Sequence, residues 1–294
     1  RGQKESWMDL STKIFGSLRQ CLRQVREVVG QMVERYFQDQ VARSSAELAY
    51  YMLFTLFPLL IFANVIISSF DLSALDLVEN LSMILPEQIV GLIAEYIAYI
   101  ASLQPSTMLY AGFVLTLYFA SRSINSLMLS IGTAYRQPRK GKISFIFSML
   151  VAGVLLISIY LLLALILVSE NFLVLLSRVT EISDSFIRLW NWLRFTVAPI
   201  YVFLIVTLFY KIAPSRWLRF RRAMPGGLFF VTVWSAISYF FSYYVSNISN
   251  YSLLYGSLGA IMILMLWFYI TGIILIMGGH LNHILLVRKQ DKQH

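Results

Sequence analysis

The sequence has little cysteine, histidine and charge, and each shortage excludes a class of protein. Cys21 is the single cysteine among 294 residues, so neither an intrachain disulfide nor a multi-cysteine zinc site can form. Only 13% of the residues are charged, whereas a soluble domain has about 25%. The chain has no P-loop, no GxSxG elbow and no HExxH motif. These shortages argue against an enzyme and against ATP-driven transport by this chain alone.

Apolar and aromatic side chains are abundant instead. The chain is 58% hydrophobic and 15% aromatic, which excludes disorder because disordered chains are poor in aromatics. Its net charge is +9. In an apolar chain, basic residues more often set orientation in a membrane than bind nucleic acid. We therefore expect a membrane protein whose partners are lipids and do not include nucleic acid.

Six stretches are apolar and long enough to cross a bilayer, which needs about 20 residues. They lie at residues 46–69, 108–131, 143–168, 189–212, 225–245 and 254–287. We therefore predict an all-α, polytopic membrane protein with six transmembrane helices in a domain of residues 46–287. Residues 1–45 form an N-terminal segment and residues 288–294 a tail.

Lysine and arginine alternate between the segments that connect these stretches. Residues 1–45 hold eight of them, whereas residues 70–107 hold none and carry five acidic residues instead. Residues 132–142 are basic again, and so is the tail. Because basic loops stay in the cytoplasm, this alternation predicts that both termini are cytoplasmic.

Two segments outside the spans have amphipathic patterns. Residues 10–37 repeat apolar positions at helical spacing with basic residues between them, which predicts a cytoplasmic amphipathic helix. That helix lies either on the bilayer surface or on the bundle. In the outer loop 70–107, Pro86 suits the first turn of a helix and an apolar stripe follows it. We expect short external helices there, which either cap a cavity or pack at the interface.

Polar residues inside apolar spans are the strongest candidates for function, because each is costly to bury in lipid. Arg122 is the clearest case, and helical spacing puts Tyr118 and Asn125 on its face. We expect that face to point into the bundle. Glu47 lies at a similar depth, so we predict a Glu47–Arg122 ion pair. It would gate a path, bind an anionic headgroup through Arg122, or simply fix the helix register.

A second candidate site lies at the outer end of the last two spans. Residues 239–259 are rich in tyrosine, serine and asparagine and carry no charge. The candidate contacts for a headgroup or a sugar are Asn247, Asn250, Tyr251 and Tyr255. An ordinary aromatic belt with a polar turn is the alternative interpretation.

Helix-breaking residues mark candidate hinges within the spans. A proline inside a helix frees a carbonyl and kinks the helix, and glycine allows close helix approach. The candidate hinge residues are Pro58, Pro199, Gly256 and Gly259. Static kinks are the alternative.

Two of the three histidines, His280 and His283, lie three residues apart near the cytoplasmic end of the last span. Neither has an acidic or cysteine partner nearby in the sequence, as a metal site would need. We interpret them as interface histidines and expect no metal and no cofactor.

Several segments together resemble the YihY / virulence factor BrkB family, over about residues 40–285. They are AELAYY at 46–51, LFPL at 56–59, ASRSIN at 120–125, PGG at 225–227 with Trp234, and SNYSLLYGSLGA at 249–260 with Leu266 and Trp267. One departure is the segment GHLN at 279–282, where the resemblance leads us to expect an acidic residue before the Leu-Asn pair.

The resemblance implies a six-helix protein of the bacterial inner membrane. Members were once labelled ribonuclease BN, but this sequence has neither a His/Asp metal cluster nor a soluble catalytic domain. Related proteins are linked to envelope integrity, serum resistance and export of lipid or lipopolysaccharide precursors.

The leading hypothesis is a transporter or flippase-like protein for a lipid or a lipid-linked envelope precursor. The alternatives are an ion or small-solute exporter and a non-transporting scaffold for envelope assembly. An exporter would need carboxylates facing its pathway, and Glu47 is the single embedded candidate. Whether the chain forms a homo-oligomer is left open by the sequence.

Overall fold

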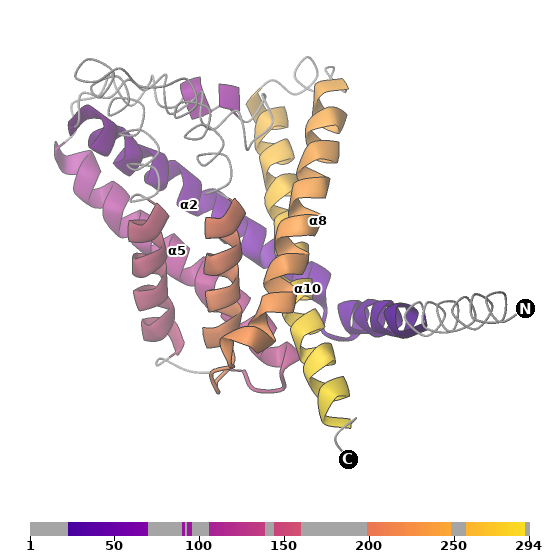
Figure 1. Cartoon of the computed structure of the whole chain (residues 1–294). Coiled ribbons are helices and arrows are strands. Elements are labelled where there is room, and N and C mark those ends of the chain that lie inside the picture. The colour runs from indigo at the N-terminus through magenta and orange to yellow at the C-terminus, as the bar shows by residue number, and fades with distance from the viewer. Residues whose placement is uncertain are drawn as a thin grey trace, which may run out of the picture.

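The computed structural model describes residues 23–69, 90–91, 93–95, 106–138, 144–159, 199–247 and 257–291 (Figure 1). Every regular element within these residues is a helix, which confirms the predicted all-α class for this part of the chain. The long helices are α2 (Val41–Ser69), α5 (Ser106–Ala134), α8 (Phe220–Asn247) and α10 (Ser257–Asp291). Further helices cover residues 23–38, Ser144–Ile159 and Pro199–Ile212.

Three of these helices are long and apolar enough to cross a membrane. The qualifying stretches are Gly112–Ala134, Phe220–Val245 and Leu258–Gln290, and two shorter apolar helices are Ser144–Ile159 and Pro199–Ile212. Each of the six predicted spans overlaps a described helix. The number six stays a prediction, because parts of the third and fourth spans lie outside the described residues. Most of the outer loop 70–107 also lies outside them.

A tight turn ends α5. The backbone N–H of Gln137 donates to the carbonyl of Gly132 at 2.8 Å, and Arg136 adopts a left-handed conformation with φ 54°. A Cβ on Gly132 would lie 2.8 Å from the Cα atom of Pro138. Glycine is therefore required where the chain folds back against the last turn of the helix.

Helix α10 is central to the described bundle, since it contacts α2, α5 and α8. Figure 1 shows α8 and α10 running side by side, while α2 is inclined and packs along α5. The helix of residues 23–38 leaves the bundle sideways, near the start of α2.

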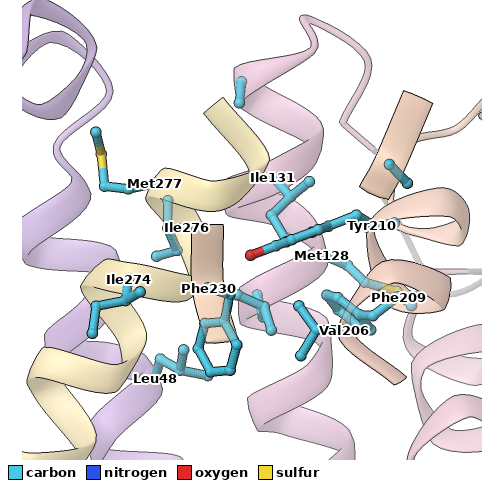
Figure 2. Close-up of a cluster of buried hydrophobic side chains, with 14 of the residues drawn as sticks. Leu48, Met128, Ile131, Val206, Phe209, Tyr210, Phe230, Ile274, Ile276 and Met277 are labelled. Carbon is cyan, nitrogen blue, oxygen red and sulfur yellow. The ribbon is translucent and has the colours of Figure 1, made fainter. Parts of the chain in front are cut away.

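The main core lies where these helices meet the helix Pro199–Ile212. Figure 2 shows Met128 and Ile131 from α5 and Ile276 from α10 near Tyr210, and Leu48 from α2 beside Phe230 in the same cluster. Tyr210 is fully buried, and its hydroxyl donates to the carbonyl of Leu275 at 2.6 Å. The phenol therefore satisfies its polar group within an apolar core.

Replacing Tyr210 with phenylalanine is expected to destabilise the protein modestly. The substitution removes one interhelical hydrogen bond, and such bonds contribute about 0.6 kcal/mol on average in membrane proteins, with a maximum of about 1.7. The ring would keep its packing. The thermal unfolding midpoint of the purified protein in detergent should fall slightly, and Tyr239→Phe, at an exposed position on α8, should leave it unchanged.

Candidate functional site

The guanidinium of Arg122 lies inside an apolar helix and contacts a tyrosine of the neighbouring helix. Arg122 is about 24 Å along α5 from its start. Its Nη2 donates to the hydroxyl of Tyr51 on α2 at 3.0 Å. Its Cζ atom also lies 5.3 Å from the centroid of the Tyr51 ring, within cation–π range. The phenol of Tyr51 therefore contacts the charge both through its hydroxyl and through its ring.

The predicted partner, Glu47, does not form a direct ion pair with Arg122 among the described residues. Glu47 is exposed on α2. Tyr51 lies four residues after Glu47, on the same face of α2 and one turn deeper. The sequence prediction therefore chose the face of α2 that contacts Arg122, but it named Glu47 and missed Tyr51. The spacing of four residues between Glu47 and Tyr51 is the signal that could have identified Tyr51.

The outer surface of α2 and α5 around Arg122 is aromatic. We call it the aromatic flank, and it consists of Tyr50, Phe54, Tyr118 and Phe119. The rings of Tyr50 and Phe54 lie 4.6 Å apart, and those of Phe54 and Phe119 lie 5.3 Å apart. Tyr118 is 49% exposed, so this residue of the predicted face does not point into the bundle, whereas Arg122 contacts α2. Arg122 is half-buried beside this flank.

Asn125 lies one turn further along α5 and faces a different neighbour. Its Oδ1 accepts hydrogen bonds from the hydroxyls of Ser144 at 3.1 Å and Ser148 at 3.4 Å, both on the helix Ser144–Ile159. Ser121 and Ser126 are buried on the same helix as Asn125. Small polar residues of this kind join helices in membranes. The structure therefore gives Asn125 packing contacts and does not bring it into contact with Arg122.

A second polar contact joins the start of α8 to the last part of α10. The side chain of Asn282 accepts from the backbone N–H of Gly226 at 2.7 Å and donates to the carbonyl of Ala223 at 3.0 Å. A Cβ on Gly226 would overlap the carbonyl of Gly278 on α10. The glycine after Pro225 therefore lets the two backbones meet, and Asn282 satisfies backbone groups beside the proline.

The two described histidines, His280 and His283, lie at packing contacts. His280 is 1% exposed, and its Nδ1 lies 3.5 Å from Oδ2 of Asp39, which precedes α2. His280 occupies the position where the resemblance leads us to expect an acidic residue, and the structure places a carboxylate opposite it.

His283 packs its ring against the ring of Tyr135, with 5.1 Å between the centroids. Burial raises the pKa of Tyr135 well above its usual range, so its phenol stays neutral. No cluster of three potential metal ligands occurs among the residues that the structure covers.

The remaining candidate residues are less informative. Asn250, Tyr251, Tyr255 and Gly256 lie outside the described residues, and Asn247 is the last residue of α8. The proposed outer site is therefore untested.

Two of the candidate hinges, Pro58 and Gly259, do not interrupt the helices in which they lie. α2 continues through Pro58, which is buried. Pro199 is the first described residue of its helix, and Gly259 is buried in the first turn of α10. Their role as hinges stays a prediction.

Comparison with known proteins gives a consistent family. The family model described as "Virulence factor BrkB" matches residues 32–294. The ribonuclease-like protein YfkH of Bacillus subtilis is 32% identical over 262 residues, which are 88% of this chain and 95% of YfkH.

UPF0761 membrane proteins of Xanthomonas axonopodis and Xanthomonas oryzae are each 26% identical over 267 residues. The match covers 84% of this chain but only 58% of either Xanthomonas protein. No solved structure matches.

Proposed function

Because the chain belongs to the virulence factor BrkB family of membrane proteins, we propose that it moves an anionic lipid or a lipid-linked envelope precursor across the bacterial inner membrane. In this proposal six helices span the membrane and both termini are cytoplasmic. The protein acts as a transporter or flippase and catalyses no chemical reaction. The ribonuclease-like name belongs to YfkH.

The position of Arg122 carries this proposal. A guanidinium has five N–H donors, and Tyr51 is its hydrogen-bond partner within the described residues. The other donors suit the oxygens of a phosphate, which arginine binds in a bidentate manner. A charge at this depth costs free energy, and membrane proteins retain such charges mainly at functional positions. Arg122 therefore suits an anionic headgroup that moves past it.

The aromatic flank supports access from the side. Arg122 is half-buried next to exposed aromatic rings on α2 and α5, rather than enclosed by carboxylates. An exposed face of a spanning helix meets lipid, so a headgroup could reach Arg122 while its acyl chains stay in the bilayer. An ion exporter is less well supported, because Glu47 is exposed and forms no ion pair with Arg122 among the described residues.

The proposal can be tested with the purified full-length protein in liposomes. Fluorescent phosphatidylglycerol and fluorescent phosphatidylcholine, each labelled on an acyl chain, serve as probes, and dithionite quenches the probe in the outer leaflet. We expect the protein to speed the exchange of phosphatidylglycerol between leaflets. A potassium or proton flux without lipid movement would instead indicate an exporter, and neither activity would indicate a scaffold. Both of these results would overturn the proposal.

A further inference from the structure

The helix of residues 23–38 is fixed to the bundle at both ends. Near its start, Arg288 of α10 donates to the carbonyl of Gln24 at 3.3 Å and pairs with Glu27 at 3.4 Å. Just after its end, Asp39 faces His280. Between these contacts, Met32 and Tyr36 pack against the main core. This helix is therefore a docked element with a defined orientation.

A second apolar strip on the same helix is exposed. We call it the exposed strip, and it consists of Val25, Val29, Val33 and Phe37. These side chains are between 52% and 72% exposed. Their spacing of four residues makes them neighbours along one side of the helix.

The arrangement around the helix axis shows that the exposed strip extends the face that packs on the bundle. At about 100° per residue, Val25 and Val29 lie directly beside Met32 and Tyr36. Gln31 and Glu34 lie on the opposite side and are exposed. The bundle thus covers only part of a wide apolar face, and the opposite face is polar.

The direction of the helix favours a lipid surface as the partner of this strip. Figure 1 shows the helix running sideways from the bundle, across the direction of α8 and α10. If α8 and α10 cross the bilayer, this helix lies along the membrane plane. Amphipathic helices with that orientation bury their apolar face at the boundary of headgroups and acyl chains.

We propose that residues 23–38 form an interfacial anchor whose exposed strip inserts into the cytoplasmic leaflet. Arg26 is exposed and lies next to Val29, three residues further along the helix, so its guanidinium can reach headgroup phosphates while its stem stays apolar. The preceding sequence adds Arg1, Lys4, Lys13 and Arg19 against Glu5 and Asp9. This basic excess suits the anionic cytoplasmic surface.

A second copy of the chain is a weaker candidate for the partner. Four side chains on one helix cannot supply the about 800 Å² per partner that a stable protein interface buries. A bilayer needs no matching surface. The anchor would also hold the helix at a fixed depth, because the contacts with Arg288 and His280 connect it to a spanning helix.

Spin labels at two positions test this inference in the full-length protein. Cys21→Ser removes the native thiol. Val29→Cys then places a label on the exposed strip, and Gln31→Cys places a matched label on the polar face. In liposomes with phosphatidylglycerol, power saturation compares the access of oxygen, which concentrates in lipid, with that of a nickel chelate, which stays in water.

We expect position 29 to be more accessible to oxygen than to the nickel chelate, and position 31 to show the reverse. Greater nickel access at position 29 would show that the strip faces water and would overturn the proposal. Spin–spin broadening at position 29 that disappears on dilution with unlabelled protein would show that a second copy covers the strip. Because neither readout depends on lipid movement, this test is independent of the transport assay.

Discussion

Replacing Gly226 with alanine is expected to separate α8 from α10 and to lower the free energy of unfolding by about 3–5 kcal/mol. The new Cβ would overlap the carbonyl of Gly278 and the side chain of Asn282. The carbonyl is backbone inside a helix, so it cannot rotate away. Moving the helices apart would also break the two hydrogen bonds of Asn282, leaving buried backbone groups unsatisfied.

The thermal unfolding midpoint in detergent measures this effect, and Gly30→Ala is its matched control. A Cβ on Gly30 would meet nothing within 4 Å. Alanine there should leave stability unchanged or raise it by up to about 1 kcal/mol, because alanine has the higher helix propensity. Equal midpoints for the two variants would show that α8 and α10 do not approach each other closely at Gly226.

Replacing Arg122 with glutamine is expected to slow the movement of an anionic lipid by about ten- to a hundredfold. A hydrogen bond to a charged group contributes about 1.5–3 kcal/mol, and each 1.4 kcal/mol corresponds to a factor of ten. Stability should change little, because the substitution also removes a charge that is costly at this depth. The initial rate for fluorescent phosphatidylglycerol in liposomes measures the effect.

Two further variants separate the parts of this contact. Tyr51→Phe removes the hydroxyl that accepts from Arg122 and keeps the ring under the guanidinium, so an intermediate loss is expected. Arg122→Lys keeps the positive charge but lacks the planar guanidinium that binds phosphate in a bidentate manner. Its rate of phosphatidylglycerol movement should therefore lie between the rates of Arg122→Gln and the wild type. If Arg122→Gln instead lowered the unfolding midpoint as strongly as Gly226→Ala, Arg122 would be fixing the helix register and the headgroup role would fail.

The sequence was sufficient to locate the helices because long apolar runs are a strong signal. The predicted span 46–69 falls within α2, and the predicted span 225–245 falls within α8. Arg122 was also identifiable, since a charge inside an apolar run is rare. These inferences depend on composition within one segment, which the linear sequence displays directly.

Contacts between distant segments could not be predicted in the same way. Helical spacing grouped Tyr118, Arg122 and Asn125, but it does not say which neighbour covers each part of α5. In the structure Tyr118 is exposed, Arg122 contacts α2, and Asn125 contacts the helix Ser144–Ile159.

The contacts of Asn282 and His280 were hidden for the same reason. Asn282 meets Gly226, and His280 faces Asp39, although each pair is far apart in the chain. Sequence motifs such as PGG at 225–227 marked the positions but not their partners.

Lipid retention is the most direct test of the claim that Arg122 recognises an anionic headgroup. The protein is purified in mixed micelles of phosphatidylglycerol and phosphatidylcholine, and native mass spectrometry counts each lipid that stays bound. Arg216→Gln is the control, because it removes one positive charge at an exposed position outside the described helices. The wild type and Arg216→Gln should retain phosphatidylglycerol preferentially, and Arg122→Gln should lose that preference. An unchanged preference in Arg122→Gln would contradict the account.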